Sequence, residues 1–145
     1  YSDKYMTFCL WAQADKKGAE NGTLWGLHYP LNNRFYVGYN SAGDLGIGLG
    51  DSHINVAATS RKADTDWHYY AATWDTSVMR LYVDGEFVLE KTAGTSPRGT
   101  YFIGSLKDRN GKMIFRWRGQ IDEVMIFNRV LSQEELARVR DGLGE

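Results

Sequence analysis

Short stretches of alternating apolar and polar residues, separated by turn-forming residues, follow one another along almost the whole chain. Alternation with a period of two is typical of a strand with one buried face. In the stretch WHYYAATWD it places Tyr70, Ala72 and Trp74 on one face and Trp67 and Tyr69 on the other. The pattern predicts strands at 6–13, 23–29, 34–40, 42–52, 54–59, 67–75, 78–83, 86–92 and 101–105, and one or two more within 113–129, interrupted at Gly119.

The turn signals between these stretches predict how some of them connect. Asp84-Gly85 stands between two β-rich runs and predicts a hairpin with a two-residue type I′ turn. Only the end of the chain departs from the strand pattern. There, Ser132 followed by Glu135 forms a capping box, and the sequence QEELARVRD before Gly142 predicts one short helix.

About ten short strands with turn signals between them are typical of an all-β sandwich or barrel. The 14% aromatic content and the 16 glycines agree with strands and tight turns. A chain of 145 residues predicts a single domain over 1–145. Because the sequence opens on tyrosine, we expect the domain to be excised from a larger protein.

Charge and cysteine content exclude several classes of function. The formal net charge is −1 and no Lys/Arg cluster exceeds a dipeptide, so the sequence predicts no nucleic-acid binding. No apolar run approaches the roughly 20 residues that span a bilayer, which predicts no membrane insertion. The single cysteine, Cys9, is expected to be a buried strand residue. His28, His53 and His68 lack the close spacing of a zinc site.

Four motifs in the C-terminal half occur in an order that resembles one known family. They are WHYYAATWD at 67–75, RLYVDG at 80–85, FIG at 102–104 and RGQIDEVMIFNRVLSQEEL at 118–136, and MTFCLWAQ adds a weaker match near the start. Together they resemble the laminin-G-like, concanavalin A-like lectin/glucanase domains. The resemblance implies an antiparallel jelly-roll sandwich of two sheets with a short C-terminal helix. It also implies a secreted or cell-surface module that binds a glycan or glycoprotein.

Two features depart from the family pattern. Tyr69 stands where such domains often carry a second histidine, and only YSDKY precedes the MTF strand, where an additional strand is usual. Either this first strand is missing or an edge near the C-terminal strand is open. An open edge predicts self-association between edge strands.

Asp122 and Glu123 interrupt an apolar strand. Strand alternation places them on opposite faces, so they cannot act together as general acid and base. Asp122 is predicted to share the buried face of Val124 and Ile126 and therefore to need backbone N–H groups, an arginine or a metal. The resemblance implies that this acid helps to hold a structural Ca²⁺, with backbone carbonyls as further ligands. A hydrogen-bonded turn carboxylate is the alternative.

The glutamates do not predict an enzyme. Related β-glucanases use an E-x-D-x-x-E strand motif that projects two glutamates from one face, and no glutamate here is followed two residues later by aspartate. We therefore expect a non-catalytic module for recognition or adhesion. A structural spacer without a ligand is the alternative, and an inactive glucanase relative is a third interpretation.

Aromatic rings and polar groups in one predicted hairpin are candidates for a ligand-binding face. Five tryptophans and nine tyrosines exceed what the core requires, and sugars stack an apolar face on an exposed ring. The predicted ligand-binding residues are Trp25, His28, Arg34, Tyr36 and Trp117.

Overall fold

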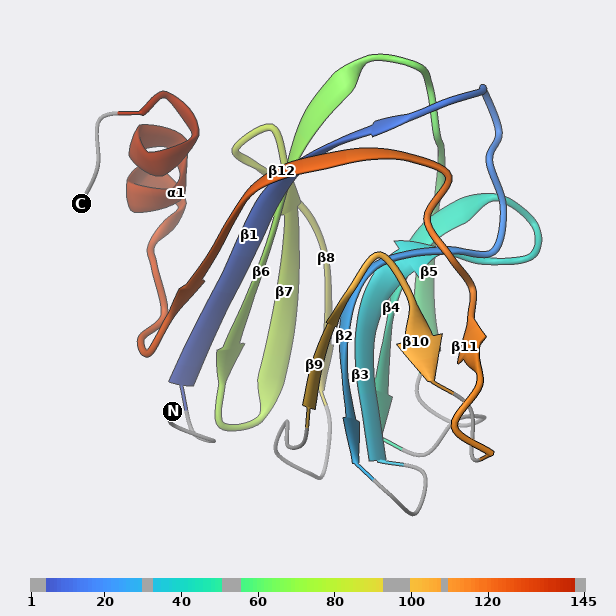
Figure 1. The fold of residues 1–145 in the computed structure, drawn as a ribbon. Helices are drawn as coiled ribbons and strands as arrows, with labels where there is room; N and C mark the ends of the chain where they lie inside the picture. The colour runs from blue at the N-terminus through green and yellow to red at the C-terminus, as the bar shows by residue number, and fades with distance from the viewer. Residues whose placement is uncertain (1–4, 30–32, 51–55, 93–99, 108–109, 143–145) are drawn as a thin grey trace.

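The computed structural model describes residues 5–29, 33–50, 56–92, 100–107 and 110–142. Two antiparallel sheets of five strands pack face to face, as Figure 1 shows. The first has the order β12 (Gly119–Phe127), β1 (Tyr5–Ala14), β6 (Trp67–Asp75), β7 (Val78–Val83), β8 (Glu86–Thr92). The second has the order β5 (Val56–Lys62), β4 (Asp44–Gly50), β3 (Asn33–Tyr39), β2 (Gly22–Tyr29), β9 (Thr100–Ile103).

The main core fills the space between the two sheets. Tyr70, Ala72 and Trp74 of β6 lie in it, which confirms the face predicted for this strand. Phe35 from the second sheet meets Trp74 edge to face, with ring centroids 5.5 Å apart. The alternation seen in the sequence therefore has the physical origin assigned to it: one face of each sheet is removed from water.

A second, smaller core lies on the other face of the first sheet, under the helix. The helix α1 (Gln133–Arg140) begins at Ser132, whose hydroxyl accepts a hydrogen bond from the Glu135 N–H at 3.1 Å, so the predicted capping box is confirmed. Leu136 and Val139 pack against Cys9 and Tyr69. Figure 1 shows α1 beside the first sheet, on the side away from the second. The expected all-β sandwich with one short C-terminal helix is confirmed.

The connection between β9 and β12 covers part of the outer face of the second sheet. It contains the two-residue strands β10 (Leu106–Lys107) and β11 (Met113–Ile114), which pair with each other. Leu106 is 1% exposed, and its side chain occupies the space that a Cβ atom at Gly26 of β2 would need. The connection then continues through residues 115–118 into β12.

β12 carries a bulge and forms a sheet edge within the described residues. Met125 pairs with Cys9 but Asp122 pairs with Trp11, so one extra residue is inserted near Glu123, whose φ is +53°. The side chains of Val124, Met125 and Ile126 are 40–43% exposed. This placement matches the open edge anticipated near the C-terminal strand, and self-association through it stays a prediction.

Candidate functional site

A small pocket of about 190 Å³ opens beside the hairpin of β2 and β3. Its aromatic lining residues are Tyr36, Phe115 and Tyr39, the last of which is only 4% exposed. Phe115 is 46% exposed, although most large apolar side chains of the described residues are buried. The remaining wall is polar or lacks a side chain, with Asn21, Thr23, Gly38 and Asn40 among the lining residues. An exposed ring beside hydrogen-bonding groups is the arrangement that binds a ligand with one apolar face and polar edges.

Backbone hydrogen bonds fix the polar side of this pocket. The N–H of Asn21 donates to the carbonyl of Asn40 at 2.9 Å. The Asn40 Oδ1 atom accepts from the N–H groups of Ala42 and Asp44 at 2.9 and 3.0 Å. Because Oδ1 is engaged twice, the Nδ2 group remains as a donor for which the described residues supply no partner.

Tyr36 lies on the outer face of the second sheet, between two glycines of the neighbouring strands. Its neighbours across β2 and β4 are Gly26 and Gly48. A Cβ atom at Gly48 would overlap the Tyr36 ring, so this ring needs a glycine beneath it. The absence of a side chain on either neighbour lets the ring lie across the sheet, as a stacking surface requires.

A larger adjoining pocket of about 630 Å³ shares Asn21 and Phe115 with the first. Lys16, Glu20, Arg116, Trp117 and Arg118 also line it. Trp117 is partly buried: its ring lies 5.9 Å from that of Tyr39 and it fills the space above Gly22. The Trp117 indole donates to the carbonyl of Gln120 at 3.3 Å. Trp117 therefore supports the pocket from the core side, and a ligand contact by this ring stays a prediction.

Trp25 lies in the core, which contradicts its predicted place on an exposed ligand face. Its side chain is 0% exposed, and its ring stacks on Phe8 with centroids 4.7 Å apart and planes 6° apart. Both faces of the predicted hairpin carry rings, so alternation alone did not show which face is buried. Tyr36, on the opposite parity, is the ring at the surface pocket.

His28 and Arg34 are cross-strand neighbours in the register of β2 and β3. Their side chains lie outside the described part of the structure, so their proposed contacts with a ligand stay predictions. His53 also lies outside the described residues.

Asp122 is exposed, and the expectation that it shares the buried face of Val124 and Ile126 is wrong. The bulge shifts the alternation, so Asp122 pairs with Trp11 and faces away from the main core. One of its carboxylate oxygens accepts from the Glu123 N–H at 2.8 Å. Within the described ranges no group of three or more His, Cys, Asp or Glu side chains could hold a metal. These residues alone do not make a calcium site, and calcium at Asp122 stays a prediction.

A thermal melt with and without excess EDTA tests the calcium prediction. A structural ion present at 100 times its dissociation constant adds about 2.7 kcal/mol of stability, so its removal would lower the melting temperature by several degrees. An unchanged melt, together with no metal in elemental analysis, contradicts the prediction.

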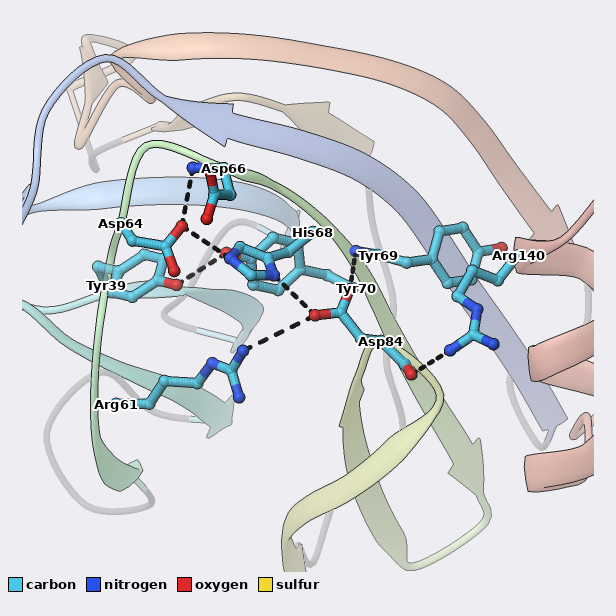
Figure 2. Close-up of polar contacts among 9 residues, drawn as sticks. All are labelled: Tyr39, Arg61, Asp64, Asp66, His68, Tyr69, Tyr70, Asp84 and Arg140. Atoms are coloured by element: carbon cyan, nitrogen blue, oxygen red, sulfur yellow. Dashed lines mark hydrogen bonds and ion pairs between the residues drawn. The ribbon is translucent and has the colours of Figure 1, made fainter.

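A charged cluster at one end of the sandwich joins both sheets and the helix (Figure 2). His68 of β6 lies between two carboxylates, with its Nδ1 atom 2.7 Å from Asp84 and its Nε2 atom 2.7 Å from Asp64. Arg61 of β5 lies 3.8 Å from the Asp84 carboxylate, and Arg140 of α1 donates to the Asp84 carbonyl. Asp84 and Gly85 have φ values of +54° and +84°, which confirms the predicted type I′ turn. Through these contacts the turn links β5 of the second sheet, β6 of the first sheet and the helix α1.

The hydrogen bonds of this cluster favour the charged form of His68. Both ring nitrogens face carboxylate oxygens, and only the imidazolium form can donate to both. Partial burial lowers the pKa of His68, but the hydrogen bonds and charges of Asp84 and Asp64 outweigh it and raise the pKa above its usual value. Partial burial also raises the pKa of Asp64, but hydrogen bonds from the Asp66 N–H and from His68 hold it below its usual range. The cluster is therefore a network of ion pairs between residues of this chain.

Several residues of the site were not predicted from the sequence. Phe115 lies within a stretch predicted as strand, but its φ of +53° ends the strand and turns the ring toward the pocket. Nothing in a phenylalanine signals such a conformation. Asn21 and Asn40 carry a clearer signal, since Asn21 directly precedes β2 and Asn40 directly follows β3, at the open end of the same hairpin. Pairing β2 with β3 in register would have brought them together.

The chain belongs to the concanavalin A-like lectin/glucanases superfamily, whose Laminin_G_3 family model matches residues 2–137. This family agrees with the two-sheet fold and with the motifs that first indicated it. No curated protein matches the chain. No helix within the described residues has the length and apolar character needed to cross a bilayer.

Solved structures of carbohydrate-binding modules and of a pentraxin share the fold. One is the carbohydrate-binding module CBM40 of Ruminococcus gnavus IT-sialidase bound to α2,3-sialyllactose, with a TM-score of 0.73, 14% identity, and coverage of 94% of this chain and 82% of that one. Domain 4 of the Geobacillus stearothermophilus arabinanase AbnA, in complex with arabinotriose, has a TM-score of 0.70 and 17% identity, and the match covers 95% of this chain and 66% of that one. The Limulus polyphemus SAP-like pentraxin has a TM-score of 0.70 and 16% identity, and the match covers 97% of this chain and 71% of that one. At these identities the likeness shows the fold.

Proposed function

We propose that this domain is a non-catalytic carbohydrate-binding module whose site is the pocket between Tyr36 and Phe115. The observation that carries the proposal is that the exposed Phe115 lines the same pocket of about 190 Å³ as Asn21 and Asn40. A pyranose has an apolar face that stacks on a ring and hydroxyl groups at its edge that pair with amides. The fold neighbours that hold sialyllactose and arabinotriose support this assignment.

The remaining parts of the proposal follow from the family and the site. The domain acts outside the cell, as a secreted or surface module that recognises a glycan or glycoprotein, in keeping with its lectin-like family. It has no hydrolase activity of its own. The chain lacks a strand motif that would project two glutamates toward one bond.

Alanine substitutions at the two rings test the site. Phe115→Ala and Tyr36→Ala should each weaken binding of the best oligosaccharide from a glycan array about fivefold or more, because truncation of an aromatic residue at a hot spot costs more than about 1 kcal/mol. Calorimetry on the purified domain measures the affinity. Phe87→Ala is the matched control, since Phe87 is 48% exposed on β8 of the other sheet and should leave binding unchanged.

Three results would contradict parts of this proposal. Absence of any glycan binding at millimolar concentration favours the structural spacer. Equal loss of binding in Phe87→Ala and Phe115→Ala rejects the location of the site. Cleavage of the bound oligosaccharide, seen by chromatography and abolished by one Glu→Gln substitution, rejects the absence of catalysis.

A further inference from the structure

The pocket next to the proposed sugar site has an excess of positive charge. Three cationic side chains, Lys16, Arg116 and Arg118, line it together with one acid, Glu20. All three cationic residues are exposed. The chain as a whole carries a formal net charge of −1, so this excess is local.

These cations lack the acidic partners that other arginines of the chain have. Arg61, Arg80, Arg129 and Arg140 each form an ion pair with an aspartate or glutamate. In the described part of the chain, no ion pair includes Lys16, Arg116 or Arg118. An unpaired guanidinium in a pocket offers a forked set of donors that matches a carboxylate.

The backbone holds the arginine segment in place before any ligand arrives. The Thr23 N–H donates to the Phe115 carbonyl at 2.9 Å, and the Trp117 N–H donates to the Gly104 carbonyl at 2.7 Å. The Asp15 N–H donates to the Arg118 carbonyl at 3.1 Å and so brings the loop that carries Lys16 against the same segment. A preorganised segment loses less conformational entropy when a ligand binds.

We propose that the adjoining pocket binds the carboxylate of an acidic sugar, so that the module prefers glycans carrying a uronic or sialic acid. The inference rests on the proposed function, because the two pockets share Asn21 and Phe115 and one oligosaccharide would occupy both. The sugar ring on Phe115 supplies stacking. The acidic residue beside it pairs with Arg116 and Arg118.

Paired acidic and neutral probes separate this preference from sugar binding itself. The probes are trigalacturonate, a hyaluronan tetrasaccharide and sialyllactose, each compared by calorimetry with its methyl ester, which keeps the ring and removes the charge. The wild-type domain should bind at least one acid about fivefold more tightly than its ester, as expected for a partly exposed charge pair. The preference should decrease as salt is raised.

Charge-removing variants locate the preference. In the double variant Arg116→Gln, Arg118→Gln, the acid and its ester should bind with equal affinity, at the affinity of the ester for wild type. Arg138→Gln is the matched control, because Arg138 is an exposed arginine of α1 outside the pocket. It should retain the full preference for the acid.

The outcomes distinguish this inference from the proposed function. Equal binding of every acid and its ester to wild type, or a preference that survives in the double variant, overturns the inference and leaves carbohydrate binding intact. Failure of acids, esters and neutral array glycans alike overturns the proposed function, and the inference falls with it.

Discussion

Replacing Trp25 with alanine is expected to destabilise the domain by about 3–5 kcal/mol, the usual cost of removing a large aromatic side chain from a core. Trp25 is 0% exposed and stacks in parallel on Phe8 of the other sheet, so its removal leaves a cavity beside the Phe8 ring in the main core. For a domain of this size the melting temperature should fall by about 10 °C or more. Circular dichroism melts of purified protein measure the shift.

Two variants make the Trp25 result specific. Trp67→Ala is the matched control, because Trp67 is 40% exposed and its loss should cost less than about 1 kcal/mol. Trp25→Phe should cost less than Trp25→Ala, since it keeps a stacking ring and removes an indole N–H that has no partner in the described structure. If Trp25→Ala has the melting temperature of wild type but no longer binds glycan, Trp25 is a ligand-binding residue and its assignment to the core is wrong.

The stability contributed by His68 is expected to depend on pH. Because the pKa of His68 is raised in the folded state, the contribution is fully present below the unfolded pKa of about 6.5 and is lost as the pH rises through the folded value. His68→Gln should therefore destabilise the domain most at pH about 5.5–6.5, by about 1–2 kcal/mol after allowance for the exposure of both carboxylates. The difference should narrow toward alkaline pH.

Urea unfolding of wild type and His68→Gln at several pH values measures this contribution. Effects of His28 and His53 cancel in the comparison, since both proteins contain them. Asp64→Asn provides a second variant, because it removes the carboxylate at Nε2 and should flatten part of the same pH dependence. A constant difference between wild type and His68→Gln from pH 5.5 to pH 9 would show that the imidazolium bridge contributes nothing.

The sequence predicted those features that depend on neighbouring residues. The type I′ turn at Asp84-Gly85 and the capping box at Ser132 and Glu135 are local, and both are present. The buried face of β6 was also predictable, because Tyr70, Ala72 and Trp74 alternate with more polar neighbours. Short-range rules are sufficient wherever a segment folds against its own neighbours.

The errors arose where long-range packing decides the outcome. Trp25 was placed outside because rings occupy both faces of its hairpin, although the glycines on the Tyr36 face, Gly26 and Gly48, marked the outer surface. Asp122 was assigned the wrong face because a bulge at Glu123, a residue with no special turn preference, reverses the alternation. The position of Phe115 depends on the connection between β9 and β12, which is distant from β2 in the sequence but folds back over it. No local pattern encodes the placements of Asp122 and Phe115.

Carbohydrate binding at the Tyr36 and Phe115 pocket is tested most directly by a nuclear magnetic resonance titration of the isotope-labelled domain with the best oligosaccharide from the array. The backbone amide signals should shift mainly for residues 16, 19–23, 36, 38–41 and 113–118, which line the two adjoining pockets. The signals of α1 and of the first sheet beneath it should remain in place. Shifts concentrated under the helix, or no shifts at millimolar oligosaccharide, would contradict the proposed site.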